Sequence, residues 1–145
     1  MAHVVVRKAE TEDAVAMSRL SGLLGYPQGP ARILGRLEVY RRSGGEVWVA
    51  EVDGQVVGFL SFHTQPCFHA AEMLGRVTAM CVDRKRCGAG RAMIEVMEAA
   101  ARKLGCSRVE VTSGEHRAQE AHLFYEAMGY QRTSVRFVKP LTRPR

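Results

Sequence analysis

One stretch decides how the chain is expected to fold: VTAMCVDRKRCGAGRAMIEVMEAAARKLG, residues 77–105. Its first six residues are an apolar run with β-branched members, which predicts a strand. Residues 84–90 form a basic turn with glycines, and apolar residues then recur with helical spacing. A strand that leads through such a turn into a helix offers unpaired N–H groups and the positive end of the helix dipole to an anion. Because Lys85, Arg86 and Arg91 add full positive charges, the stretch predicts a site for a phosphorylated ligand.

The composition is that of an ordinary globular chain with a basic charge balance. The 145 residues are 46% hydrophobic and 25% charged, with a formal net charge of +6 at pH 7. This length predicts a single domain, residues 1–145. No apolar run is long enough to cross a membrane, and the N-terminus lacks the apolar core and cleavage site of a signal peptide. We therefore expect a cytoplasmic protein.

The cysteines and the charge exclude some classes of function. Cys67, Cys81, Cys87 and Cys106 form no C-x-x-C pair, so no metal site is expected. We interpret Cys81 and Cys106 as small buried hydrophobes. Cys87 lies in the basic turn, but a catalytic thiol there is the weaker interpretation because no partner residue can be named. The basic residues are dispersed along the chain, which makes a nucleic-acid-binding module a less favoured alternative.

Periodicity and turn signals predict a mixed α/β fold. The expected strands are residues 4–7, 46–51, 55–62, 73–82, 108–113 and 130–138, and the expected helices are residues 11–24, 31–42, 89–104 and 117–128. The order is β-α-α-β-β-β-α-β-α-β, with antiparallel hairpins first and alternating β/α units last. This order predicts a mixed, mostly antiparallel sheet of six to seven strands, flanked by about four helices.

The glycines of the turn do not form a dinucleotide or a P-loop motif. Met93 stands at the third position of a Rossmann fingerprint, where a small residue is needed, and no Gly-Lys-Ser/Thr follows the turn.

Two motifs instead resemble the GCN5-related N-acetyltransferase (GNAT) superfamily. The first is the family's acetyl-CoA signature, Arg/Gln-x-x-Gly-x-Gly/Ala, which stands here as KRCGAG over residues 85–90. The second is the later pattern Ala-x-x-Phe/Leu-Tyr-x-x-x-Gly-Phe/Tyr, which stands here as AHLFYEAMGY over residues 121–130. The order of the elements is also similar to that of the family, so the resemblance implies the GNAT fold.

The resemblance implies how acetyl-CoA would bind. Its pyrophosphate would lie on the N–H groups of the turn, and its pantetheine would pair with the main chain of the strand before the turn, like an added strand. An N–H group of that strand would also meet the thioester oxygen as an oxyanion forms. The residues that the resemblance assigns to the cofactor are Met80, Cys81, Val82, Lys85, Arg86, Cys87, Gly88, Ala89, Gly90 and Arg91.

The resemblance also implies one catalytic residue. Tyr125 would protonate the leaving thiolate of coenzyme A or position a water molecule. The alternative is a core aromatic residue, since Tyr125 shares a helix face with Ala121 and Met128. The general base is left open among Glu51, Glu72, His63, His69, His122 and a water relay, because the position where many relatives carry a glutamate falls near Arg76.

The chain departs from the family pattern in two places. Lys85 replaces the usual Arg or Gln, and the turn is two residues short, so a second register, Cys87-x-x-Gly90-x-Ala92, stays open. Ala118 stands where many relatives have an asparagine.

The expected function is transfer of an acetyl group from acetyl-CoA to a primary amine, on a small molecule or a protein, by direct attack on the thioester. A non-catalytic acyl-CoA-binding sensor is the alternative from another class. The family's frequent dimers suggest a homodimer, and no membrane partner is expected.

Overall fold

The computed structural model describes residues 3–83, 87–113 and 118–142. The chain divides into two compact units, residues 1–112 and 113–145, which are described separately below. The expectation of a single domain stays a prediction.

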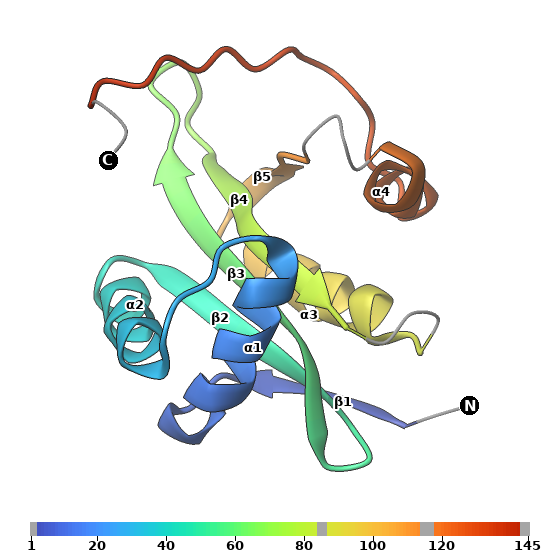
Figure 1. Ribbon diagram of the computed structural model, residues 1–145. Coiled ribbons are helices and arrows are strands. Elements are labelled where there is room, and N and C mark those ends of the chain that lie inside the picture. Colours follow the sequence, from blue (N-terminus) through green and yellow to red (C-terminus); the bar gives the residue numbers. More distant parts are fainter. Residues whose placement is uncertain (1–2, 84–86, 114–117, 143–145) are drawn as a thin grey trace. The chain divides into compact units, whose positions relative to one another are not determined.

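In its described part, the first unit is a mixed five-stranded sheet with three helices (Figure 1). Its strands lie in the order β1-β2-β3-β4-β5, and they are β1 (Val4–Lys8), β2 (Gly45–Val52), β3 (Gln55–Pro66), β4 (Met73–Val82) and β5 (Cys106–Val111). Neighbouring strands from β1 to β4 are antiparallel, and β5 is parallel to β4. The hairpin predicted at Asp53-Gly54 is confirmed, with both residues at positive φ.

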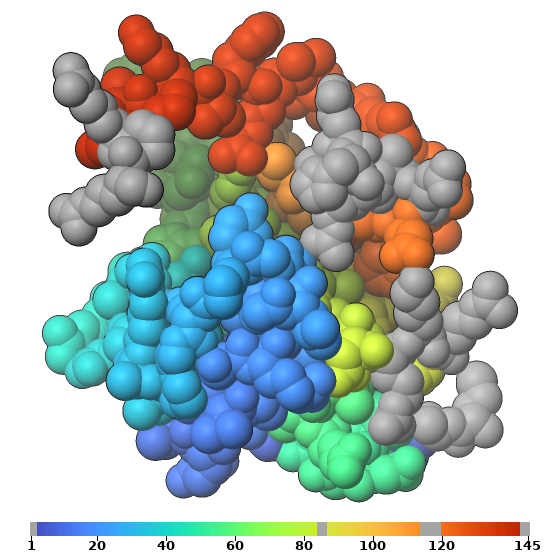
Figure 2. Space-filling view, viewed as in Figure 1, coloured from blue at the N-terminus to red at the C-terminus, as the bar shows by residue number. Residues whose placement is uncertain are grey.

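Helices α1 (Ala14–Leu24) and α2 (Pro30–Arg42) cover one face of the sheet, and Figure 2 shows them side by side on that face. The 3₁₀ turn η1 (Thr11–Asp13) leads into α1. Apolar residues of α1 and α2 form a buried core with residues of the strands: Met17, Leu20, Ile33, Leu37, Val49, Phe59 and Cys81.

Helix α3 (Ala89–Lys103) packs against the sheet with a strongly amphipathic face. The predicted apolar positions of this helix are confirmed as buried: Met93, Ile94, Met97 and Ala101. Burial of each methionine or isoleucine side chain among them stabilises the fold by about 1.5–3 kcal/mol. The helix ends where the sequence predicts, because Gly105 adopts the left-handed conformation with φ +81°.

The second unit has a π-helical turn, η3 (Ala118–His122), that continues into the short helix α4 (Leu123–Ala127). The strand predicted over residues 130–138 is wrong. This segment has no regular secondary structure, and the sheet formed by the described residues has five strands rather than six or seven. The alternation of apolar and polar residues there describes which side chains would share a face. A strand also needs a neighbour for its N–H and C=O groups, which periodicity cannot supply.

A charged cluster joins β1, η1 and β2. The guanidinium of Arg7 bonds both oxygens of Asp13, with N–O distances of 2.7 and 2.8 Å, and also contacts Glu51 at 2.6 Å. Asp13 is buried, and it accepts a further hydrogen bond from the N–H of Glu10 at 2.7 Å. The hydrogen bonds from Arg7 lower the pKa of Asp13, and they outweigh burial, which acts in the opposite direction.

This cluster predicts an acid-sensitive contribution to stability. Because the pKa of Asp13 is lowered by folding, the stabilisation is complete at neutral pH. It is lost as pH falls below the ordinary pKa of aspartate, about 3.9, and through the lowered value. We expect Asp13→Asn to reduce the free energy of unfolding by about 2 kcal/mol at pH 7, since charge-assisted hydrogen bonds are lost. Urea unfolding at neutral and acidic pH measures this difference, which should shrink in acid.

The matched control is Asp53→Asn, because Asp53 is exposed in the β2–β3 turn and asparagine tolerates its positive φ. An unfolding free energy of Asp13→Asn that equals that of the wild type at pH 7 would contradict a stabilising role for the cluster.

Candidate active site

Strand β4 extends beyond its parallel neighbour β5. The ladder between the two strands ends at the pair Val77–Val111, whereas β4 pairs with β3 as far as Val82. Residues 78–82 therefore have β3 on one side and lie outside the ladder with β5 on the other. This segment contains three of the residues assigned to the cofactor, Met80, Cys81 and Val82, and it leads directly into the turn.

The side chains of these three residues differ in their surroundings. Met80 and Val82 are half-buried. Cys81 is buried, and its thiol donates to the carbonyl oxygen of Leu20 at 3.4 Å. The interpretation of Cys81 as a small buried hydrophobe is therefore confirmed, and any role in ligand binding falls to its main chain.

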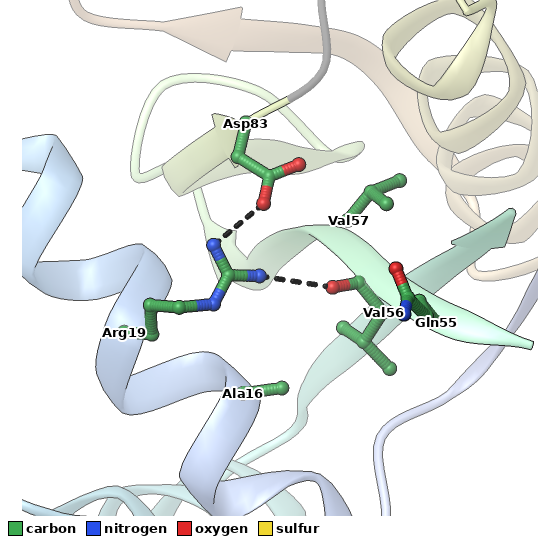
Figure 3. A pocket seen from close by; sticks show the side chains of 6 residues that line it. All are labelled: Ala16, Arg19, Gln55, Val56, Val57 and Asp83. Atoms are coloured by element: carbon green, nitrogen blue, oxygen red, sulfur yellow. Dashed lines mark hydrogen bonds and ion pairs between the residues drawn. The ribbon is translucent and has the colours of Figure 1, made fainter.

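Asp83 fixes the point where the strand ends and the turn begins. Its N–H donates to the carbonyl of Val57 at 2.8 Å, and its carboxylate accepts from Arg19 of α1 at 2.6 Å (Figure 3). Arg19 also donates to the carbonyl of Val56 at 3.3 Å. The group borders an open pocket of about 500 Å³, lined by Ala16, Arg19, Gln55, Val56, Val57 and Asp83. Arg19 spans this pocket between α1 and Asp83, so we interpret it as the residue that holds Asp83 in place at the end of β4.

The end of the turn has the backbone expected of an anion site. Gly88 is the N-cap of α3, with φ +84°, and its carbonyl accepts the first helical hydrogen bond, from the N–H of Ala92 at 3.0 Å. No side chain of the described residues caps this end, and the first turn carries no acidic residue. The N–H groups at the start of α3 and the positive end of its dipole therefore favour an anion.

The predicted site residues on either side of Gly88 are placed as follows. Ala89 is buried, Gly90 is half-buried, and Arg91 is exposed, with its guanidinium 3.9 Å from Glu95. Cys87 is half-buried and forms no disulfide. Lys85 and Arg86 lie outside the described residues. The choice between the two registers of the turn therefore stays open.

Tyr125 belongs to the second unit, on α4. Its ring contacts those of Phe124 and Tyr130 edge to face, with centroids 5.4 and 6.0 Å apart. The N–H of Tyr130 donates to the carbonyl of Tyr125 at 2.9 Å. Tyr125 is half-buried, and no residue of α4 is fully buried. Two aromatic neighbours thus hold the ring while part of the side chain stays accessible.

The candidates for the general base separate into distinct environments. Glu51 is held by Arg7 in the charged cluster, which favours a structural role. Glu72 and His69 are exposed in the segment before β4. His122 lies in the second unit, with Nε2 3.3 Å from the carbonyl of Ser113.

His63 lies on β3, opposite Arg76 of β4. Its Nδ1 donates to the carbonyl of Thr64 at 2.7 Å, and its Nε2 lies 3.0 Å from the hydroxyl of Ser43. Arg76 lies near the position where the resemblance implies a glutamate in many relatives.

Sequence reasoning missed a chain of hydroxyl groups on the face covered by α1 and α2. It joins Tyr40 of α2, Thr78 of β4 and Ser61 of β3. Its members lie far apart in sequence and no local pattern connects them, so only the register of the strands reveals it.

Within the described residues, no three His, Cys, Asp or Glu side chains converge as metal ligands would. None of the helices that the structure describes is long and apolar enough to span a membrane.

The sequence matches a protein-family model described as "Acetyltransferase (GNAT) domain" over residues 43–132. This match covers more than half of the chain and includes both the β4–α3 turn and α4. The protein therefore belongs to the GNAT family of acetyltransferases, whose members transfer acetyl groups from acetyl-CoA.

Known relatives agree with this assignment. An aminoalkylphosphonate N-acetyltransferase of Salmonella typhimurium strain LT2 is 32% identical over 91 residues. That match spans 61% of this chain but only 58% of the relative's length. An acetyltransferase of Trypanosoma brucei superposes with a TM-score of 0.80 at 25% identity, over 96% of this chain and all of the other.

A further structure shares the fold alone. It is the aminoglycoside N-acetyltransferase AAC(6′)-Iy in complex with coenzyme A, with a TM-score of 0.82 at 14% identity, over 98% of this chain and 97% of the other.

Proposed function

We propose that this protein transfers an acetyl group from acetyl-CoA to a primary amine by direct attack of the amine on the thioester. The observation that carries the proposal is the continuity of the site. The part of β4 beyond the β5 ladder ends at Asp83, whose N–H is bonded to Val57, and α3 begins shortly after it at Gly88, where none of the described side chains caps the helix. The family's use of acetyl-CoA supports this choice of donor.

Each part of the site then has a role toward acetyl-CoA. The turn from Lys85 to Arg91 and the first N–H groups of α3 bind the pyrophosphate, with Gly88, Ala89 and Gly90 supplying main chain rather than side chain. The pantetheine lies along residues 78–82 as an additional strand, close to Met80, Cys81 and Val82. In this proposal Cys87 contributes through its main chain.

The reaction balances without a further reactant. The neutral amine nitrogen attacks the carbonyl carbon, and the oxyanion is stabilised by an N–H group of β4. The intermediate collapses with cleavage of the C–S bond, and coenzyme A leaves as a thiolate. Tyr125 donates a proton to that thiolate, and the proton lost by the amine restores the tyrosine through solvent or a base. The products are an amide and coenzyme A.

A small amine that also carries an acidic group is the acceptor class to test first. The Salmonella relative is named for an aminoalkylphosphonate, which has both groups. In this chain Arg76 and Arg108 both contact one carboxylate, that of Glu110, at 3.6 and 3.4 Å. Two guanidinium groups beside one carboxylate leave a local positive charge, which favours an anionic acceptor.

A ligand panel tests the proposal. We expect acetyl-CoA and coenzyme A to raise the thermal stability of the protein, and NADH and DNA to leave it unchanged. A ligand at 100 times its Kd adds roughly 2.7 kcal/mol to the free energy of unfolding, which a thermal shift detects readily. Amine-dependent release of the thiol then separates an enzyme from an acyl-CoA sensor. Absence of any shift at millimolar acetyl-CoA would rule out the proposed donor. The homodimer and the cytoplasmic location stay predictions.

A further inference from the structure

Three hydroxyl groups meet at an irregularity in β4. Ser61 pairs with Ala79 and Phe62 pairs with Val77, so Thr78 is the extra residue of a β-bulge. The Oγ1 atom of Thr78 lies 2.7 Å from the Oη of Tyr40 and 2.7 Å from the Oγ of Ser61. We call these three residues the hydroxyl chain. Ser61 is its buried end and Thr78 is exposed.

The ring of Tyr40 is held in place from several sides. A Cβ atom at Gly45, the first residue of β2, would lie 2.6 Å from Cδ2 of Tyr40, so only glycine leaves room for the ring. The Tyr40 ring also meets that of His63 edge to face, with centroids 5.8 Å apart. His63 is fixed in turn by its contacts with Thr64 and Ser43. The position of the Tyr40 hydroxyl is therefore set by three elements, α2, β2 and β3.

The hydroxyl chain can accept further hydrogen bonds from a ligand. A hydroxyl group has one donor and two acceptor lone pairs. If Ser61 donates to the carbonyl of Ala79, at 3.5 Å, then Thr78 donates to Ser61 and Tyr40 donates to Thr78. In that arrangement both Thr78 and Tyr40 keep a lone pair for an incoming N–H group. A cationic or partly charged amine favours this orientation, because it turns every O–H dipole away from the positive charge.

The position of Thr78 connects this chain to the proposed reaction. Thr78 is the first residue of β4 beyond the ladder with β5, which ends at Val77. It therefore stands at the start of the segment along which the thioester is proposed to lie. An amine bound to its hydroxyl would be next to the strand that holds the acetyl group.

We infer that Thr78 and Tyr40 bind the acceptor amine beside the thioester, and that Ser61 positions Thr78 for this contact. The inference rests on the proposed function and deepens it, because it assigns the amine to a pair of oxygen acceptors. Proximity of this kind contributes to catalysis by holding the two reactants together.

The test compares the two substrates in the same variants. We expect Thr78→Val, which keeps the shape and removes the hydroxyl, to lower kcat/KM for the amine about tenfold or more. Tyr40→Phe should act in the same direction, and Thr78→Ser should restore most of the activity. The KM for acetyl-CoA should stay within about twofold in all of them, since they change only side chains, whereas acetyl-CoA is proposed to bind the main chain of β4 and the turn.

The matched control is Thr64→Val, because Thr64 is on β3, outside the hydroxyl chain, and its hydroxyl donates to the carbonyl of Gly44 at 3.4 Å. Thermal unfolding and the shift with acetyl-CoA identify any variant that fails to fold, in which case Ser61→Ala takes its place.

The outcomes are distinct. If the wild type is active and Thr78→Val and Tyr40→Phe leave kcat/KM for the amine within twofold, the inference is overturned while the proposed function stands. An equal change in the constants for both substrates also overturns it, since that indicates a structural role. A wild type that releases no thiol with any amine overturns the proposed function and this inference with it.

Discussion

Replacing Tyr125 with phenylalanine is expected to lower kcat by about 10²–10⁴-fold, because the leaving thiolate loses its proton donor. The ring should stay where it is, since its edge-to-face contacts with Phe124 and Tyr130 do not involve the hydroxyl. Binding of acetyl-CoA and the unfolding temperature should therefore change little. Steady-state kinetics with saturating acetyl-CoA, together with a thermal unfolding curve, measure both quantities.

The control for this prediction is Tyr130→Phe, which removes the hydroxyl of the neighbouring ring in the same cluster. It should retain most of the wild-type turnover. If Tyr125→Phe keeps full turnover while acetyl-CoA still binds, Tyr125 is a packing residue, and the alternative interpretation of this tyrosine is correct.

Replacing Gly88 with valine is expected to weaken acetyl-CoA binding by about 10–100-fold, because a β-branched residue does not tolerate positive φ. The φ of Gly88, the N-cap of α3, is +84°, and a β-branched side chain there would disfavour this conformation at the start of the helix. The same strain should reduce the free energy of unfolding by about 1–3 kcal/mol. Titration calorimetry gives the affinity, and urea unfolding gives the stability.

Gly105 offers a matched control at the other end of α3. Its φ is +81°, and a Cβ atom would meet nothing within 4 Å at either position. Gly105→Val should therefore cost similar stability and leave the affinity for acetyl-CoA unchanged. Equal affinity in the two variants would show that the conformation at Gly88 is not needed for binding.

Much of the first unit could be predicted from local patterns. The apolar stripe of α3, the Asp53-Gly54 hairpin and the glycine that ends α3 each follow from a periodicity or a backbone preference within a few residues. The predicted strand over residues 130–138 failed for the opposite reason, since forming a strand depends on a partner elsewhere in the chain.

The same distinction applies to the site. The end of β4 and the glycine N-cap of α3 are adjacent in sequence, so a short motif was enough to locate them. The contact between Glu51 and Arg7, which favours a structural role for this base candidate, joins residues 44 positions apart and follows from no local pattern. The hydroxyl chain depends on a bulge at Thr78, which is a property of the register between β3 and β4. Features of this kind can be identified only when the three-dimensional positions of the residues are known.

The central claim, acetyl transfer from acetyl-CoA to an amine, is tested most directly by one coupled measurement. Purified protein is mixed with acetyl-CoA and a panel of primary amines, beginning with small amines that carry an acidic group. The concentration of free thiol is followed over time, and the molecular mass of the amine is measured by mass spectrometry at the end point. We predict amine-dependent thiol release matched by one acetyl group added to the amine for each thiol released. Thiol release that is the same with and without every amine, with no acetylated product, would contradict the account.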